Sequence, residues 1–246
     1  MMRQKRVIVT GGSRGIGKAI ADTLVRRRYD VTIVARDEQC LRRCVSVLSG
    51  KGKIRYEVLD LLDRQAIERF AAQWRKKHLY ALINNAGMWG EERIDEVDTG
   101  LYQRIMRLNL DGPFCLTNEL VSSLVDGGRI VNISSQLGIS GRAAFGAYAA
   151  SKHGLIGLTR CWAYELGPRG ITVNAVCPGW VDTESNRAEI RPWAKERGMS
   201  VPALMREISA PYPSQRFVEE AEVGELVAFL VSPEGSGVNG KVLEIT

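Results

Sequence analysis

The sequence predicts an α/β protein with a doubly wound, Rossmann-type fold, in which about seven parallel strands carry helices on both faces. Two observations predict it. Short apolar runs rich in β-branched residues recur along the chain, and segments of helical periodicity separate most of them. Because crossovers between parallel strands are right-handed, this alternation places helices on both faces of the sheet. The predicted strands span residues 6–10, 31–35, 54–59, 80–84, 129–133, 171–176 and 242–245.

The chain is expected to form one domain over residues 1–246, because this length suits a single core and no change in composition marks a boundary. The alternation of strands and helices is interrupted once, between Gly179 and the last strand. This interval contains scattered tryptophans, methionines and prolines before a helix predicted at 218–231. We expect residues of about 183–216 to form a lid over an apolar substrate pocket. The alternative is that they only pack on the edge of the sheet.

The composition excludes several classes of protein. Hydrophobic residues make up 45% of the chain and charged residues 25%, and no apolar run approaches the ~20 residues of a membrane span. The basic N-terminus lacks the apolar stretch of roughly 7–15 residues that a secretory signal needs, so we predict a cytoplasmic protein without a membrane partner. We interpret the net charge of +6 as a basic surface, since no basic patch interleaved with aromatic residues predicts nucleic-acid binding.

The cysteines and histidines do not predict a metal centre. The five cysteines stand at positions 40, 44, 115, 161 and 177, and their odd number and scattered spacing do not suit a disulfide framework. Only two histidines are present, His78 and His153. A histidine-rich metal site is therefore excluded, no metal is predicted, and a Ser–His–Asp hydrolase is disfavoured for the same reason.

The first predicted strand leads directly into a glycine-rich loop that precedes a helix. Its glycines let the backbone approach a ligand closely, and the helix N-terminus offers unpaired N–H groups and positive potential. Such a loop after the first strand of a doubly wound sheet binds the pyrophosphate of a dinucleotide. The spacing Gly11-x-x-x-Gly15-x-Gly17 differs from Gly-x-Gly-x-x-Gly, and the loop lacks the Gly-Lys-Ser/Thr ending of a nucleoside-triphosphate loop.

With this loop, four further motifs in the same order resemble the short-chain dehydrogenase/reductase superfamily in its single-domain form, including its 3-oxoacyl-carrier-protein reductases. The resemblance covers nearly the whole chain. It implies a single dinucleotide-binding catalytic domain and an oxidoreductase that uses a nicotinamide cofactor. The motifs are Thr10-Gly11-x-x-x-Gly15-x-Gly17, Asn84-Asn85-Ala86-Gly87, Asn109-x-x-Gly112, Tyr148-x-x-x-Lys152 with Ser135 thirteen residues before the tyrosine, and Pro178-Gly179-x-x-x-Thr183.

Four residues are the predicted catalytic group. Tyr148 and Lys152 are four residues apart, so they share one face of a helix, and the ammonium is expected to lower the pKa of the phenol. Tyr148 would then exchange a proton with a carbonyl or an alcohol oxygen. Ser135 follows a strand at its carboxyl end, where its hydroxyl can hold the oxygen on which charge develops. The resemblance implies that Asn109 positions a water that links Lys152 to solvent; the alternative is that Asn109 only bonds backbone groups.

The resemblance also implies how the other motif residues meet the cofactor. Lys152 would hold the nicotinamide ribose. Thr183 would hold the carboxamide or a phosphate, with the Val181 backbone beside it, and Asp60 would meet the adenine. The segment 85–87 would pass along the adenosine ribose. The predicted cofactor-binding residues are Gly11, Ser13, Arg14, Gly15, Ile16, Gly17, Arg36, Asp60, Leu61, Asn85, Ala86, Gly87, Tyr148, Lys152, Pro178, Gly179, Val181 and Thr183.

The residues after the second predicted strand favour NADP(H) over NAD(H). An acidic residue at the end of that strand would bond the ribose 2′-hydroxyl and repel a 2′-phosphate, but position 35 is Ala. Arg36 follows it, and Arg14 lies in the glycine loop; both can pair with a 2′-phosphate. Asp37 is the contrary feature, because it would reach the hydroxyl if the strand ended later.

We therefore predict an NADPH-dependent reductase that transfers a hydride to a ketone or oxoacyl carbonyl, with Tyr148 as the acid and base. Two alternatives stay open. An NAD(P)-dependent alcohol, sugar-alcohol or hydroxysteroid dehydrogenase would use the same catalytic residues, whereas a non-catalytic NADP-binding sensor would not need them. The predicted pocket wall is largely apolar, which favours a lipophilic or medium-sized small-molecule carbonyl substrate. Its residues are Met88, Trp89, Gln136, Leu137, Phe145 and Trp180.

A homotetramer is predicted, with a dimer as the alternative, because the helix through Tyr148 is apolar over more than the single stripe that a surface helix needs. Relatives use this helix, and the long one before it, in a subunit interface. The resemblance further implies that the substrate is carried as a thioester on an acidic carrier protein, recognised by Arg129 and Arg169. The alternative is that these two arginines bond helix carbonyls or pair at the interface.

Overall fold

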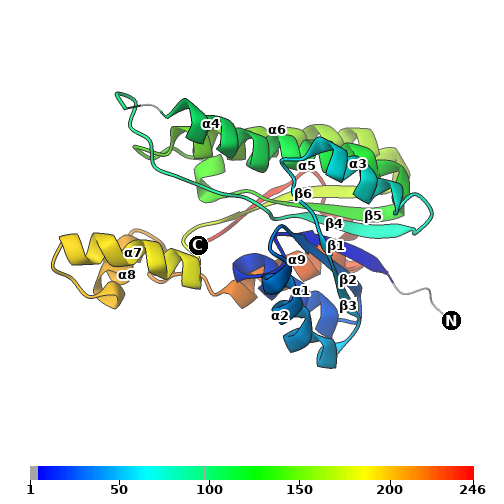
Figure 1. Cartoon of the computed structure of the whole chain (residues 1–246), viewed down its shortest axis with the longest axis horizontal. Coiled ribbons are helices and arrows are strands. Elements are labelled where there is room, and N and C mark those ends of the chain that lie inside the picture. Colours follow the sequence, from blue (N-terminus) through cyan, green and yellow to red (C-terminus); the bar gives the residue numbers. More distant parts are fainter. Residues whose placement is uncertain (1–4, 97) are drawn as a thin grey trace.

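The structure is a computed structural model that describes residues 5–96 and 98–246. Among these residues, seven strands form one sheet in the order β3-β2-β1-β4-β5-β6-β7, and every neighbouring pair runs parallel. Helices cover both faces of the sheet (Figure 1), which confirms the predicted doubly wound fold. The strands are β1 (Arg6–Thr10), β2 (Asp30–Ala35), β3 (Ile54–Val58), β4 (Leu79–Asn84), β5 (Leu124–Ile133), β6 (Thr172–Pro178) and β7 (Val242–Ile245).

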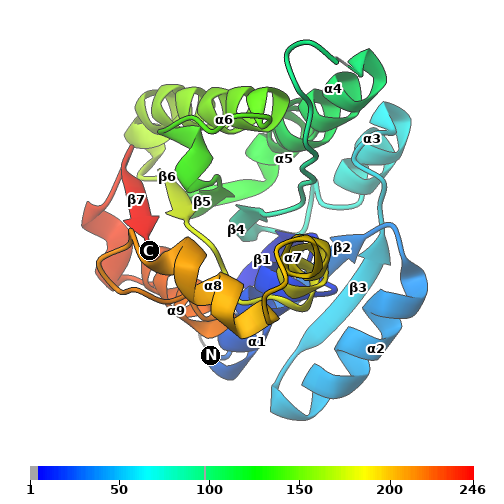
Figure 2. The same ribbon diagram turned by 90° about the vertical axis from the view of Figure 1, so that its left-hand side faces the viewer.

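The helices divide between the two faces of the sheet (Figures 1 and 2). One face is covered by α1 (Gly15–Arg26), α2 (Glu38–Leu48) and α9 (Glu220–Val231). The other face is covered by α3 (Arg64–Ala72), α4 (Thr99–Met106), α5 (Gly112–Leu120) and α6 (Gly146–Leu166). A π-helical turn over Arg107–Asp111 joins α4 to α5, and short 3₁₀ turns lie at Ser49–Lys51, Val121–Ser123, Gln136–Gly138, Gly167–Arg169 and Glu234–Gly237.

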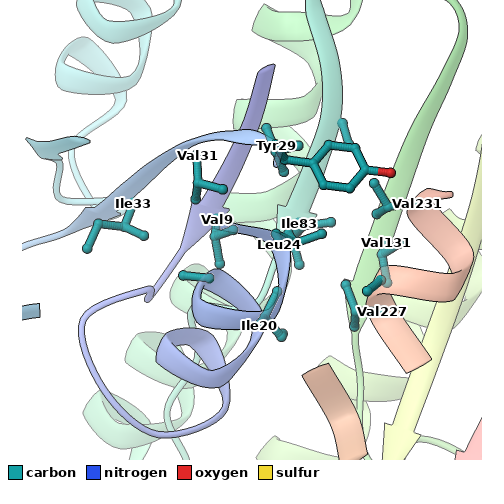
Figure 3. Close-up of a cluster of buried hydrophobic side chains, with 14 of the residues drawn as sticks. Val9, Ile20, Leu24, Tyr29, Val31, Ile33, Ile83, Val131, Val227 and Val231 are labelled. Carbon is teal, nitrogen blue, oxygen red and sulfur yellow. The ribbon is translucent and has the colours of Figure 1, made fainter. Parts of the chain in front are cut away.

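Each face of the sheet carries its own apolar cluster, because side chains along a strand point alternately to opposite faces. In β1, Val7 and Val9 join the cluster beneath α1 and α9, whereas Ile8 joins the cluster on the other face. Figure 3 shows the first cluster, in which Leu24 of α1 and Val227 of α9 pack among the strands. Burial on both faces explains why these strands are almost uninterrupted apolar runs in the sequence.

The chain between β6 and α9 forms two further helices, α7 (Glu184–Glu196) and α8 (Val201–Ser209), which project beyond the carboxyl edge of the sheet (Figures 1 and 2). Their buried residues are separate from the two clusters of the sheet. Ile190 and Ala194 of α7 pack with Leu204 of α8 and with Phe217, beside partly buried tryptophans and methionines. Both helices lie within the predicted 183–216 segment, whose role as a lid stays a prediction.

The observed strands lie within about two residues of the predicted ones, with one exception. The fifth strand was expected from residue 129, but β5 begins at Leu124. Gly127, with φ of +74°, and Gly128 interrupt the apolar pattern on which the prediction depends. Within the described residues, no helix is long and apolar enough to cross a membrane, and no group of three or more His, Cys, Asp or Glu side chains is placed to hold a metal ion.

Candidate active site

The carboxyl ends of the central strands open into a cleft of about 1640 Å³. The segments that follow β1, β2, β4, β5 and β6 line this cleft, and residues of α7 together with Tyr212 close one side of it. The strand order reverses between β1 and β4. Parallel sheets bind their ligands at such a point, outside the carboxyl ends of the strands.

The glycine loop after β1 is fastened to the chain that follows β4. Thr10 Oγ1 accepts hydrogen bonds from the backbone N–H groups of Asn85 and Ala86, both at 2.9 Å. The Asn85 amide donates to the Thr10 carbonyl, also at 2.9 Å. Gly11 has a left-handed φ of +62°, and a Cβ on Gly17 would lie 2.2 Å from the Gly11 carbonyl oxygen. A side chain at either glycine would therefore displace the loop.

Two adjacent serines follow β5, and the structure gives them different roles. The Ser134 hydroxyl is buried and donates to the Lys152 carbonyl at 3.1 Å, so it fastens α6 to the strand. The Ser135 hydroxyl accepts a hydrogen bond from the Leu137 N–H at 3.1 Å and is also hydrogen-bonded to Tyr148. Ser135 lines the cleft beside Tyr148, so it is the serine whose contacts suit a reacting oxygen.

Tyr148 and Lys152 lie one turn apart near the start of α6. The Lys152 ammonium donates to the Ile133 carbonyl at 2.8 Å and lies 5.7 Å from the centre of the Tyr148 ring. Lys152 is only 4% exposed, and this burial lowers its pKa from 10.5 to about 8. A Cβ on Gly87 would lie 3.4 Å from Nζ, so a glycine there leaves room beside the ammonium. Because an ammonium has three protons, Lys152 can bond a ligand as well as Ile133.

The predicted direction of the Tyr148 pKa is wrong for this structure. Burial raises the pKa of the phenol, and the hydrogen bond with Ser135 only opposes that shift. Desolvation disfavours the phenolate, and it outweighs the hydrogen bond with Ser135, which favours that form. Tyr148 is consequently a neutral phenol at neutral pH, which is the form that can donate a proton.

Asn109 is fully buried in the π-helical turn between α4 and α5. Its side-chain amide accepts from the Met88 N–H and donates to the Met88 carbonyl, both at 2.8 Å, and it also donates to Ser151 Oγ at 3.1 Å. Single π-helical turns of this kind are frequent at functional sites. Asn109 thus fixes the backbone after the Asn-Asn-Ala-Gly motif against α6, while the predicted water beside Lys152 stays a prediction.

The residues expected to select the cofactor lie together. Arg14 and Arg36 both line the cleft, and β2 ends at Ala35, where the prediction placed its end. Asp37 is engaged in the helix that follows. Its carboxylate caps α2 by accepting from the Cys40 N–H at 2.9 Å and from the Cys40 thiol at 3.2 Å, and these hydrogen bonds lower its pKa.

Most of the other predicted cofactor residues also line the cleft. Thr183 does so while its hydroxyl accepts from the Asn186 N–H at 3.0 Å and caps α7. Asp60 does not line the cleft, because its carboxylate accepts from the Leu62 N–H at 2.9 Å. The predicted residues that line it are Gly11, Ser13, Arg14, Gly15, Ile16, Gly17, Arg36, Leu61, Asn85, Ala86, Gly87, Tyr148, Pro178, Gly179, Val181 and Thr183.

The predicted substrate wall is present with one change. Met88 packs against the cluster of the sheet and does not line the cleft. The centres of the Trp89 and Phe145 rings lie 5.6 Å apart, and those of Trp180 and Phe217 are equally close. The predicted residues that line the cleft here are Trp89, Gln136, Leu137, Phe145 and Trp180.

Tyr212 and Arg142 are among the cleft residues that the predicted site does not name. Tyr212 donates its hydroxyl to Gln136 Oε1 at 2.7 Å, which ties the 183–216 segment to the segment after β5. Arg142 lines the same region and packs against aromatic rings. Arg142 is visible in the sequence between the serine and tyrosine motifs. The contacts of Arg142 and Tyr212, however, join segments that are distant along the chain, so the sequence does not reveal them.

The guanidinium groups of Arg129 and Arg169 form hydrogen bonds or ion pairs within the protein itself. Arg129 is 4% exposed, and its guanidinium donates to the carbonyls of Gly128 at 2.9 Å and Ser232 at 3.4 Å. Arg169 forms an ion pair with Asp126 at 3.0 Å. Burial of Arg129 removes it as a contact for a carrier protein, and the hydrogen bonds to carbonyls match the alternative interpretation.

The profile of the short chain dehydrogenase family matches residues 5–194, which is more than half of the chain. The chain belongs to the short-chain dehydrogenase family. This short-chain dehydrogenase is 34% identical over 245 residues to the granaticin polyketide synthase putative ketoacyl reductase 1 of Streptomyces violaceoruber, covering 97% of this chain and 90% of the relative. It is also 34% identical over 248 residues to a 3-oxoacyl-(acyl-carrier-protein) reductase of Thermotoga maritima, covering 98% and 96%.

A solved structure shares the fold of this short-chain dehydrogenase. A variant of the actinorhodin polyketide ketoreductase with NADPH superimposes with a TM-score of 0.91 at 33% identity, covering 98% of this chain and 95% of the other. The family and these relatives confirm the resemblance that the motifs predict. The protein is an oxidoreductase that acts on CH–OH or C=O groups with a nicotinamide cofactor.

Proposed function

We propose that the protein is an NADPH-dependent reductase that transfers a hydride to the carbonyl carbon of a ketone or oxoacyl compound, with Tyr148 as the acid–base group. The observation that carries this proposal is that Ser135 and Tyr148 line the cleft that also holds the glycine loop, with the Lys152 ammonium 5.7 Å from the centre of the Tyr148 ring. The names of the relatives, ketoacyl reductases and a ketoreductase with NADPH, support it.

The cleft fits a nicotinamide dinucleotide. Gly15 has a left-handed φ of +54°, and a Cβ there would meet Thr183 Cγ2 at 3.8 Å, an ordinary contact, so glycine is required by the backbone rather than by crowding. The loop leads into the N-terminus of α1, whose unpaired N–H groups suit a pyrophosphate. Lys152 would hold the nicotinamide ribose, and the bound nicotinamide supplies the hydride.

The side chains then act on the carbonyl oxygen of the substrate. The raised pKa keeps Tyr148 protonated, so its phenol donates a proton to this oxygen as negative charge develops there. The Ser135 hydroxyl, oriented by the Leu137 N–H, donates a hydrogen bond to the same oxygen. The Lys152 ammonium stabilises the phenolate that remains, and its pKa of about 8 lets it return a proton near neutral pH.

We propose NADP(H) as the cofactor because Arg14 and Arg36 line the cleft where β2 ends; Asp37 lines it there as well, but its carboxylate caps α2. Replacing Arg36 by Ala removes a bidentate partner of the 2′-phosphate. We expect KM for NADPH to rise about 10- to 100-fold, with less than about a threefold change for NADH. Arg43→Ala, an exposed arginine of α2 outside the cleft, is the matched control. Equal use of both cofactors by the native protein contradicts the assignment.

We propose a homotetramer in which α5 and α6 form a subunit interface. Phe114 of α5 is 45% exposed and stacks on Trp162 of α6 with ring centres 6.4 Å apart. Exposed aromatic side chains that gather on one face favour burial against a second copy. Light scattering tests this assembly: a tetramer is expected, and a monomer at micromolar concentration contradicts it.

The activity itself is tested with a panel of carbonyl compounds and NADPH, run beside the matching alcohols with NADP⁺. The panel holds small ketones, oxoacyl thioesters, steroid ketones and sugar ketones, because a dehydrogenase of alcohols, sugar alcohols or hydroxysteroids would use the same catalytic residues. We expect reduction of ketones or thioesters in preference to sugars, since aromatic rings form the cleft wall. The proposal would be overturned if the protein consumed no NADPH with any member of the panel.

A further inference from the structure

The guanidinium of Arg142 is held in the substrate region of the cleft by aromatic rings. Its central carbon lies 5.2 Å from the centre of the Phe145 ring, 5.6 Å from that of Trp180 and 6.0 Å from that of Trp193. Cation–π contacts of this length are attractive. A guanidinium beside aromatic rings keeps its N–H groups as donors, and its planar fork suits a bidentate partner.

Among the described residues, no carboxylate forms an ion pair with the Arg142 guanidinium. Within residues 5–96 and 98–246, the Arg142 side chain has neither an ion pair nor a hydrogen bond, although fifteen other ion pairs form there. Arg142 is exposed to the cleft that it lines. An oriented cation without a protein anion in a ligand cleft is suited to an anion on the ligand.

The loop that carries Arg142 is rigidly built. Ala144 adopts a left-handed φ of +64°, which is unfavourable for a residue with a Cβ. Three hydrogen bonds impose it. The Phe145 N–H donates to the Arg142 carbonyl at 3.2 Å, the Glu92 N–H donates to the Ala144 carbonyl at 2.9 Å, and the Ala147 N–H donates to Glu92 Oε1 at 3.1 Å. The position of Arg142 is thus fixed before a ligand arrives.

Arg142 lies in the loop after β5, away from the strands whose loops suit the phosphates of the cofactor. Arg14 and Arg36, which suit those phosphates, follow β1 and β2, whereas Arg142 belongs to the segment after β5. The sheet order puts β2 and β5 three strands apart, which is about 14 Å at the usual spacing. The neighbours of Arg142 are Trp180 and Phe145, residues of the predicted substrate wall.

We propose that Arg142 binds an anionic oxygen group of the substrate, so that the substrates are carbonyl compounds that also carry a carboxylate or a phosphate. The inference rests on the proposed reductase function and names its substrate class. Two sources share this chemistry: the free carboxylate of an oxo acid, and the phosphate on the pantetheine arm of a thioester. In this proposal the carbonyl would bind at Ser135 and Tyr148 and the anion at Arg142. The carboxylate of an oxo acid is close to the carbonyl and the phosphate of the pantetheine arm is far from it, so only one of the two sources can match the spacing of the two sites.

The experiment compares two matched pairs of substrates, each with one neutral and one anionic member. The first pair is methyl acetoacetate and acetoacetate, and the second is the acetoacetyl thioester of N-acetylcysteamine and that of phosphopantetheine. Arg142→Gln is expected to lower kcat/KM about 10- to 100-fold for the anionic member of the pair that matches the natural source, mainly through KM. The neutral members should change less than about threefold, and Arg142→Lys should recover part of the loss.

Two controls make the result decisive. Arg191→Gln removes an exposed arginine of α7 that does not line this cleft, and it should leave all four substrates unchanged. Tryptophan fluorescence of the NADP⁺-loaded protein, which holds no hydride to transfer, reports binding of acetoacetate and phosphopantetheine without turnover, because Trp180 and Trp193 contact Arg142. Equal losses for neutral and anionic members, or binding that survives Arg142→Gln, would overturn the inference. If none of the four substrates is reduced while anion binding still depends on Arg142, the proposed reductase function fails and the anion site stands.

Discussion

By the catalytic cluster we mean the four residues proposed for catalysis, Asn109, Ser135, Tyr148 and Lys152. Two of them, Ser135 and Tyr148, line the same cleft as the 183–216 segment, but the cluster and the segment are held in different ways. Asn109 bonds both polar groups of the Met88 backbone, and Lys152 bonds a carbonyl of β5. The 183–216 segment packs around a small cluster of its own, and Tyr212 hydrogen-bonds across the cleft to Gln136.

This difference suggests that the catalytic cluster determines the reaction, whereas the 183–216 segment determines which substrate binds. Lys152 and Asn109 of the catalytic cluster are hydrogen-bonded to the main chain at Ile133 and Met88, so a change in their geometry would break these bonds. The 183–216 segment can move or vary while the sheet stays intact, because few of its contacts are shared with the sheet. We therefore expect substitutions in the cluster to alter the reaction or the stability, and substitutions in the segment to alter affinity for the substrate.

The largest effect is expected for Tyr148→Phe. The change removes the proton donor and leaves the ring, so kcat should fall about 10²- to 10⁴-fold while the affinity for NADPH changes little. Steady-state kinetics and a fluorescence titration with NADPH measure the two quantities. Retention of more than about a tenth of kcat would exclude Tyr148 as the donor.

Substitution of one asparagine in each region compares how much each region contributes to the free energy of unfolding. Asn109→Leu removes three hydrogen bonds of a fully buried side chain, two of them to the Met88 backbone, and the free energy of unfolding should fall by about 2–4 kcal/mol. Asn186→Leu removes one hydrogen bond, to the Val181 carbonyl, in a partly exposed part of the segment, and should cost less than about 1 kcal/mol. Urea denaturation measures both, and equal losses would contradict the distinction.

The lowered pKa of Lys152 predicts that the free energy of unfolding depends on pH. Its pKa is about 8 in the folded protein and 10.5 in an exposed reference state, so between these values the unfolded chain binds more protons. Stability from this group therefore rises with pH across that window, by about 3 kcal/mol in total. Lys152→Met removes the titration and serves as the control. The native protein should gain stability relative to this variant from pH 8 to pH 10, whereas a constant difference would show that the ammonium is not desolvated.

The smallest effect is expected for Tyr212→Phe. It removes the hydrogen bond to Gln136 and keeps the ring, so kcat/KM should fall about two- to fivefold and the free energy of unfolding by less than about 1 kcal/mol. Kinetics with the best substrate of the panel measure the first value. A loss as large as that of Tyr148→Phe would place Tyr212 in the chemistry and remove the contrast between the two regions.

The sequence indicates that Ser135, Tyr148 and Lys152 lie near one another because the signals for these residues are local; their catalytic roles stay a prediction. Tyr148 and Lys152 are one helical turn apart, and Ser135 directly follows a strand that the apolar pattern reveals. The direction of the Tyr148 pKa was missed because spacing reports a neighbouring charge and says nothing of desolvation. Tyr212 and Arg142 were missed for another reason. The rings around Arg142 come from three separate segments, and only the folded chain brings them together.

The central claim is that one carbonyl oxygen meets Ser135 and Tyr148 while the cofactor occupies the glycine loop. A crystal structure with NADP⁺ and the alcohol product tests it most directly. We predict that the product hydroxyl lies within hydrogen-bond distance, about 3 Å, of both Ser135 Oγ and Tyr148 Oη, with the Lys152 ammonium at the nicotinamide ribose. A product hydroxyl bound away from these two oxygens, or a nicotinamide ring outside the cleft, would contradict the account.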